Sequence, residues 1–252
     1  MNLQNQTPKI LAIITAVTFI VVFTLVKPIS QVSEYHHFAN EIKLFGIQNF
    51  WNVVSNFGFI LTGLFGIVGL KKGKEKNPID SVLFLGILLT GFGSAYYHYS
   101  PNNASLVWDR LPMTLVFASF FASFYSNFFC KKIGFKIWLF NLVLGVLSVF
   151  YWQYTESINK GDLRLYAIVQ FLPIILTLII FTIHYKQHPK LLKPMLLTIV
   201  FYLLAKFLEH FDYQIFEICK IISGHPLKHI AASIATYFIF KSSSSKTNLK
   251  TI

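Results

Sequence analysis

The sequence predicts an all-α protein that crosses a membrane several times as a helical bundle. Of its 252 residues, 54% are hydrophobic and only 13% are charged, whereas an average soluble domain is about 25% charged. The mean hydropathy is +0.57, and eight apolar stretches approach the roughly 20 residues that one membrane crossing requires. They lie at residues 10–26, 49–70, 81–98, 108–129, 135–153, 164–185, 194–210 and 222–240. This composition excludes an ordinary soluble globule, a disordered chain and a conventional nucleic-acid-binding module.

The first stretch, residues 10–26, is expected to be a retained transmembrane helix rather than a signal peptide. Its basic start is weak, because only Lys9 precedes it closely. It is also longer than the apolar region of about 7–15 residues that a signal peptide contains. The residues that follow it, Val26-Lys27-Pro28, form no cleavage site of small residues. Residues 1–48 are therefore predicted to form an N-terminal helix and an outer loop.

Short connections join the stretches, so they are predicted to form one compact bundle, in which residues 49–240 contain the last seven. Residues 241–252 are expected to be a polar cytoplasmic tail, which begins Lys-Ser-Ser-Ser-Ser-Lys. Cys130 and Cys219 lie far apart in the sequence and form no metal or redox motif.

The distribution of basic residues predicts the orientation. Fourteen of the 22 Lys and Arg residues lie at the N-terminus, after even-numbered stretches or in the tail, and six lie at the opposite ends. Lys and Arg concentrate in cytoplasmic loops, so both termini are predicted to be cytoplasmic. The net charge of +12 is then explained by these loops and by anionic lipid headgroups rather than by nucleic acid. Short loops and a Lys-rich inner face suit a bacterial inner membrane.

Five polar residues are predicted to lie at one depth, near the outer ends of three helices. Ser94 and His98 end the third stretch, Asp109 begins the fourth, and His225 and His229 begin the eighth. Residues four apart share one helix face, and three imidazoles plus water make a catalytic zinc site. A carboxylate can orient such a ligand or its water. A lone histidine here would be an interfacial side chain, but three separate elements at one depth favour a metal site.

The outer end of the seventh stretch carries Lys206, Glu209 and Asp212. Lys206 and Glu209 are three residues apart on one helix, which predicts an ion pair. Lys228 lies between His225 and His229 and is expected to point off their face, toward an acid or the substrate. The sequence assigns no role to Asp212.

Taken together, these residues resemble the alkaline ceramidase family, including its phytoceramidase-like members, within the CREST superfamily of membrane hydrolases. That superfamily has a Ser-xxx-His, an Asp and a C-terminal His-xxx-His, in this order. The chain matches with Ser94-xxx-His98, Asp109, His225-xxx-His229 and the stretch Phe50-Trp51-Asn52. The similarity covers about residues 36 to 240.

The resemblance implies a seven-helix core to which the helix at 10–26 is added. It implies zinc held by His98, His225 and His229, with Asp109 and Ser94 close to the metal-bound water. It also implies a membrane enzyme of sphingolipid metabolism that hydrolyses the amide of ceramide to a fatty acid and a sphingoid base. Ser94 is not in a Gly-x-Ser-x-Gly elbow, so the expected nucleophile is zinc-bound water.

Two departures from the family pattern concern calcium and the substrate. Eukaryotic alkaline ceramidases bind calcium through an acidic segment before the Phe-Trp-Asn stretch. Here that segment reads Tyr-His-His-Phe-Ala-Asn-Glu over residues 35–41, and Asn49 stands where an acid is expected. The sequence therefore argues against calcium binding. Arg110 follows Asp109 where an acidic residue is common, which leaves the substrate preference open.

Three alternative functions remain at this point. The first is a zinc hydrolase of another N-acyl or ester lipid, which the sequence does not distinguish from a ceramidase. The second is a non-enzymatic seven-helix receptor, against which the short loops argue. The third is a transporter, which would spread its polar residues through the membrane depth. The sequence predicts a lipid substrate and no nucleic-acid partner, and it makes no prediction of oligomeric state.

Overall fold

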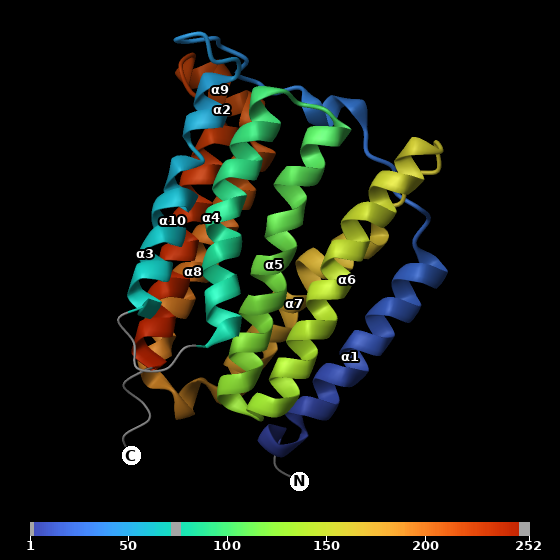
Figure 1. Ribbon diagram of the computed structural model, residues 1–252, viewed down its shortest axis with the longest axis vertical. Helices are drawn as coiled ribbons and strands as arrows, with labels where there is room; N and C mark the ends of the chain where they lie inside the picture. Colours follow the sequence, from blue (N-terminus) through green and yellow to red (C-terminus); the bar gives the residue numbers. More distant parts are fainter. Residues whose placement is uncertain (1–2, 72–76, 247–252) are drawn as a thin grey trace. The chain divides into compact units, whose positions relative to one another are not determined.

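A computed structural model describes residues 3–71 and 77–246, the last four by their backbone alone (Figure 1). The described residues form helices and no β-strand, with a single isolated bridge between Leu44 and Ile47. Two parts of the predicted cytoplasmic face lie outside the described residues. They are the loop with the lysines at 72, 74 and 76 and the end of the tail, residues 247–252.

Each apolar stretch of the sequence corresponds to helical structure. The helices are α1 (Leu3–Leu25), α2 (Phe50–Val54), α3 (Phe57–Lys71), α4 (Pro78–Tyr99), α5 (Asn103–Phe128), α6 (Lys131–Ser157), α7 (Arg164–His184), α8 (Pro189–His210), α9 (Asp212–Cys219) and α10 (Gly224–Lys246), with short 3-10 turns η1 (Ser33–His36) and η2 (Tyr185–Gln187). The predicted stretch 49–70 is interrupted at Ser55 and Asn56. Both side chains there bond to the backbone carbonyl of Asn52, and such local bonds compete with the helical ladder.

Seven helical stretches among the described residues are long and apolar enough to cross a membrane, with α2 and α3 counted as one. The eighth predicted stretch, 222–240, corresponds to α10, which has 23 residues but does not meet the same composition criterion. Its first two turns contain His225, Lys228 and His229, which lower its hydropathy. The helix continues beyond the predicted end of the core, where buried Ser242 bonds to the carbonyl of Ile239. A total of eight crossings therefore remains a prediction.

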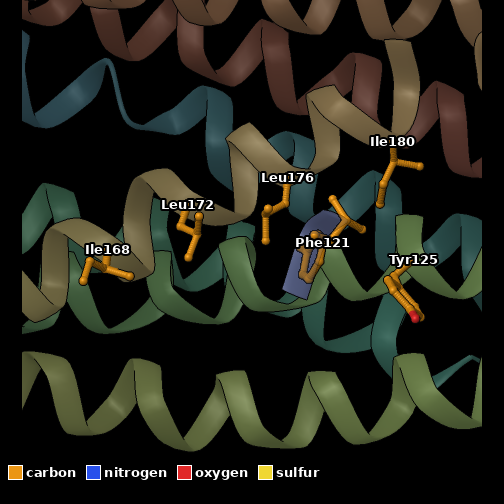
Figure 2. Packing of buried hydrophobic residues seen from close by; sticks show 7 residues of the cluster. Phe121, Tyr125, Ile168, Leu172, Leu176 and Ile180 are labelled. Atoms are coloured by element: carbon orange, nitrogen blue, oxygen red, sulfur yellow. The ribbon is translucent and has the colours of Figure 1, made fainter. Parts of the chain in front are cut away.

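The chain divides into two compact units. The first comprises Met1–Val32, Pro78–Leu83 and Met113–Pro189. Within it, α7 packs against α1 and α6. An apolar cluster within it is shown in Figure 2 and consists of Leu11, Phe121, Tyr125, Ile168, Leu172, Leu176 and Ile180. A smaller cluster forms around Trp138, whose indole nitrogen donates to the hydroxyl of Ser119.

The second unit comprises Ser33–Asn77, Phe84–Pro112 and Lys190–Ile252. Within it, α10 packs against α2, α3 and α9. Because α4 and α5 contribute their residues 84–99 and 103–112, all five predicted site residues belong to this unit. The proposed regions 1–48, 49–240 and 241–252 do not follow these units and remain a prediction.

Candidate metal centre

Three histidines from two helices meet in the second unit. His98 lies in the last turn of α4, whereas His225 and His229 lie on successive turns of α10. One ring nitrogen from each lies within 4.8 Å of the other two, so the group could hold a metal ion. His98 and His229 are only 2% and 5% exposed. The structure therefore brings together the three histidines predicted as metal ligands.

One pair of ring nitrogens has the separation expected of two ligands on a tetrahedral metal ion. Nε2 of His98 and Nε2 of His225 are 3.4 Å apart. Two nitrogen ligands at about 2.0–2.1 Å from a tetrahedral zinc ion are themselves about 3.3–3.4 Å apart. Three imidazoles are also a donor set that zinc accepts while keeping one coordination position for water.

The imidazole of His229 is held in one tautomer by residues at the break between α2 and α3. Its Nδ1 lies 2.8 Å from the hydroxyl oxygen of Ser55. That hydroxyl donates to the Asn52 carbonyl at 3.2 Å, and the same carbonyl lies within hydrogen-bonding reach of His229. Because a carbonyl only accepts, this pattern of hydrogen bonds favours the tautomer with the proton on Nδ1 of His229, which leaves the lone pair of Nε2 for a metal.

The backbone of His225 is held by Asp212, which the sequence left without a role. The Asp212 carboxylate is only 8% exposed, and it accepts a hydrogen bond of 2.6 Å from the backbone N–H of His225. Its other oxygen accepts from the backbone N–H of Ala39 at 3.2 Å. A carboxylate at the first turn of α10 satisfies an unpaired backbone donor and complements the helix dipole. Asp212 thus connects the start of the ligand-bearing helix to the segment before α2.

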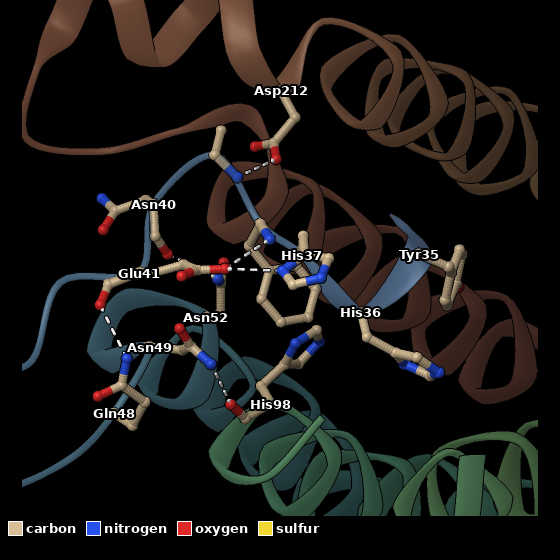
Figure 3. A network of polar contacts seen from close by, with 12 residues as sticks. Tyr35, His36, His37, Asn40, Glu41, Gln48, Asn49, Asn52, His98 and Asp212 are labelled. Atoms are coloured by element: carbon tan, nitrogen blue, oxygen red, sulfur yellow. Dashed lines mark hydrogen bonds and ion pairs between the residues drawn. The ribbon is translucent and has the colours of Figure 1, made fainter. Parts of the chain in front are cut away.

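That segment is tied to the site by buried asparagines (Figure 3). Asn49, in the left-handed conformation with φ of 52°, donates from Nδ2 to the backbone carbonyl of His98 at 2.8 Å. Asn52 donates to the Asn40 carbonyl at 3.1 Å, and Asn40 donates to the Ile221 carbonyl at 2.7 Å. The segment is therefore held by amide hydrogen bonds to α4 and to the loop before α10.

Phe38 of the same segment covers two of the histidines. Its ring centroid lies 4.8 Å from that of His98 and 4.9 Å from that of His225, both edge-on. Phe38 is only 5% exposed, so its ring shields these imidazoles from water.

The same region has fewer carboxylates than the calcium site that the family resemblance suggests, although the side-chain oxygens of Asn49 and Asn52 are buried without a hydrogen-bond partner. Calcium takes about 6–8 oxygen ligands, with several carboxylates among them. Glu41 supplies one carboxylate, which accepts from the backbone N–H of Phe38 and lies 3.7 Å from Nδ1 of His37. The side-chain nitrogens of Asn40 and Asn49 donate to backbone carbonyls. The amide network performs the connecting role here, and independence from calcium remains a prediction.

Asp109 and Ser94 lie together on neighbouring helices. Ser94 is one turn before His98 and is 4% exposed, and its hydroxyl is hydrogen-bonded to the Asp109 carboxylate. Asp109 is not among the residues whose donor atoms form the metal-ligand group. The charges that act on it come from Lys228, Arg110 and Glu209. The arrangement is that of a carboxylate oriented by a hydroxyl, beside the histidines rather than among them.

A further ionic cluster adjoins α10. Lys206 donates to one oxygen of Glu209 at 2.8 Å, which is the predicted ion pair. Lys228 donates to the other oxygen of Glu209 at 2.5 Å. Lys228 therefore points to an acid and not into the histidine group, as the sequence suggested.

Three residues missed by the sequence analysis lie on the other side of His98. The hydroxyl of Tyr97 donates to the backbone carbonyl of Tyr35 at 3.2 Å. Nδ1 of His36 lies 3.0 Å from that hydroxyl, and its Nε2 lies 3.0 Å from Oδ1 of Asn103. Burial lowers the pKa of His36 below its ordinary value. No periodicity or spacing connects residues 35 and 36 to residue 97.

The helical bundle and the buried histidines define a multi-pass membrane protein with a candidate metal centre. Residues 42–247 match the family model described as Ceramidase, and the chain therefore belongs to the ceramidase family. This membership supports a membrane enzyme that hydrolyses ceramide. A search of curated proteins found no match. Helix α1 precedes the matched residues, and its status as an addition to the core remains a prediction.

Proposed function

We propose that this protein is a zinc-dependent integral-membrane amidase that hydrolyses the N-acyl bond of ceramide-like lipids to a fatty acid and a sphingoid base. The observation that carries the proposal is the buried group of His98, His225 and His229, with two Nε2 atoms 3.4 Å apart. Membership of the ceramidase family supports the substrate class.

Zinc bound by these histidines would polarise the amide carbonyl and lower the pKa of a bound water to about 7. Asp109 is the group placed to accept a proton from that water and to return it to the leaving nitrogen. Ser94 donates its single O–H to Asp109 and thereby orients the carboxylate; when Asp109 carries the proton from the water, that O–H becomes available to the developing oxyanion. Ser55 and Asp212 hold two of the ligands, and Phe38 keeps water away from the imidazoles.

The proposed location suits this reaction. The basic residues predict cytoplasmic termini, which places the outer ends of α4 and α10 at the non-cytoplasmic face of what we propose is a bacterial inner membrane. The amide of a ceramide-like lipid lies near the headgroup level, with its chains in the bilayer. A metal centre at the helix ends would meet this amide without removing the chains from the membrane.

The proposal is tested with purified protein in detergent and a defined ceramide, with released fatty acid and sphingoid base measured by mass spectrometry. We expect release that stops when a chelator removes zinc and returns when zinc is added. Asp109→Asn should lower the rate by about 10²- to 10⁴-fold, the range of a lost general acid–base group, and His225→Ala should abolish it.

His210→Ala is the matched control, because His210 ends α8 and lies outside the metal-ligand group. Full activity of zinc-free protein, or of His225→Ala, would exclude zinc catalysis. Zinc-loaded protein that releases nothing from ceramide would refute the ceramide assignment.

A further inference from the structure

Two lysines share a single carboxylate beside the candidate metal centre. Glu209 accepts Lys206 on one oxygen and Lys228 on the other, at 2.8 and 2.5 Å. The cluster formed by Lys206, Glu209 and Lys228 therefore carries two positive charges and one negative charge. Glu209 takes one of the three N–H donors of Lys228.

This cluster acts directly on the reacting groups. Lys228 immediately precedes His229. The positive charge of Lys228 interacts electrostatically with all three histidines and with Asp109. Arg110, which is 6% exposed, adds a further positive charge next to Asp109.

The acidic groups nearby are already engaged. Asp109 is bonded to Ser94. The two oxygens of Asp212 accept the backbone N–H groups of Ala39 and His225. Counted together, Lys206, Lys228 and Arg110 balance Glu209, Asp109 and Asp212, so the excess of positive charge is confined to the cluster of two lysines around one carboxylate.

A purely structural role explains this cluster poorly. Two apolar side chains would join α8 to α10 at least as well, because the desolvation of ions offsets much of their attraction. Ionisable residues in membrane helices are usually functional. The Lys206 side chain is 42% exposed and that of Lys228 is 16% exposed, so neither side chain is completely enclosed by protein.

We propose that Lys228, positioned by Glu209 and assisted by Lys206, binds an anionic headgroup of the lipid substrate. The preferred substrate is then an N-acyl lipid whose headgroup carries phosphate, sulfonate or carboxylate oxygens, rather than a neutral ceramide. In a sphingoid lipid the headgroup oxygen is attached to the carbon next to the one that bears the amide nitrogen. An anion there lies only a few atoms from the reacting carbonyl. Lys228 is correspondingly adjacent in sequence to His229, one of the proposed zinc ligands. This inference rests on the proposed amidase function and specifies its substrate.

The test compares two N-acyl sphingoid lipids with the same acyl chain, one with a free primary hydroxyl and one with a 1-phosphate. Both are presented in neutral detergent micelles to zinc-loaded protein. We expect kcat/KM to be about tenfold or more higher for the phosphorylated lipid, as befits a hydrogen bond to a charged group. The difference should lie mainly in KM and shrink with added salt.

Variants separate headgroup binding from structural support. Lys228→Met should lower kcat/KM for the phosphorylated lipid by about tenfold more than for the neutral lipid, so that the preference for phosphate disappears, while zinc content is kept. Glu209→Gln, which keeps both ammonium groups, should keep or increase the preference. Lys43→Met is the matched control, because it removes an exposed cation of the same unit outside the cluster.

Equal kcat/KM for the two lipids in the unaltered protein would overturn this inference and leave the proposed amidase function intact. So would a Lys228→Met variant that slows both lipids equally. Failure of zinc-loaded protein to hydrolyse either lipid would instead contradict the proposed function itself.

Discussion

At the scale of single residues, a hydroxyl from outside α10 decides which nitrogen of His229 faces a metal. The Ser55 hydroxyl donates its hydrogen bond to the Asn52 carbonyl, and its oxygen is therefore available to accept from Nδ1 of His229. An orienting partner of this kind both fixes the ring and raises its basicity. The effect depends on the interruption between α2 and α3, because a continuous helix would place residue 55 in a different direction.

Ser55→Ala should therefore weaken zinc binding by about 10- to 100-fold, the usual effect of losing such a partner. Ser55→Thr, which keeps the hydroxyl, should retain more affinity. The measurement is a competition titration against a chromophoric zinc chelator. Ser100→Ala, at an exposed position of the same unit, serves as the control. Unchanged affinity in Ser55→Ala would show that the hydroxyl does not orient His229.

At the scale of helices, the approach of α4 to α5 brings Ser94 to Asp109. A Cβ added at Gly93 would collide with the backbone carbonyl of Trp108. A backbone atom cannot move aside as a flexible side chain can, so the glycine is what allows this contact.

Gly93→Ala should destabilise the protein by about 1–3 kcal/mol, as overpacking does, and should lower activity further by separating Ser94 from Asp109. Chemical denaturation in detergent micelles measures the first effect, and the ceramide assay measures the second. Ala104→Ser, which enlarges an exposed residue in the first turn of α5, should change neither. A stable and fully active Gly93→Ala would contradict the tight contact.

The connection between α6 and α7 contains an ion pair that predicts a dependence on pH. The Asp162 carboxylate accepts from Nε and Nη2 of Arg164 at 2.9 and 2.7 Å. Another nitrogen of Arg164 donates to the Val26 carbonyl at 2.8 Å, which ties this connection to the end of α1. Hydrogen bonding from Arg164 holds the pKa of Asp162 below its ordinary value.

The unfolded chain therefore binds a proton to this carboxylate at a higher pH than the folded protein does. The stabilisation is complete above the unfolded pKa of about 3.9 and is lost as pH falls through the lower folded pKa. Asp162→Asn should lower the thermal midpoint at pH 7, and its difference from the unaltered protein should shrink toward pH 3. A constant difference over this range would exclude a contribution from the charge of Asp162.

At the scale of the whole molecule, a metal bound only by the folded chain stabilises it as any ligand does. Two of the proposed ligands come from α10 and one from α4, so unfolding would separate them and destroy the site. Ligand linkage then ties zinc concentration to thermal stability.

Zinc at about a thousandfold over its Kd should stabilise the protein by about 4 kcal/mol. A thermal scan of metal-free protein with and without added zinc tests this directly. The shift should disappear in the double variant His225→Ala/His229→Ala and persist in His210→Ala. A shift of equal size in the double variant would show that zinc binds elsewhere.

The helical class and the approximate position of each long helix could be predicted from the sequence, because apolar runs of membrane length are a local property. The five candidate site residues could be predicted too. His225 and His229 share a helix face by their spacing alone, and the loop charges put them at the depth of His98. The ceramidase resemblance, inferred from the same residues, is confirmed by the family match.

Other features were decided only by tertiary structure. Asp212 bonds to residues 13 and 173 positions away, and Ser55 bonds to a histidine 174 positions away. No repeat or spacing encodes such pairs, because they exist only once the helices have packed. The sharing of Glu209 between two lysines likewise required α8 and α10 to lie side by side at that turn. The sequence alone determined the type of protein and the histidines proposed as ligands, whereas packing determined how those histidines are oriented and which charges surround them.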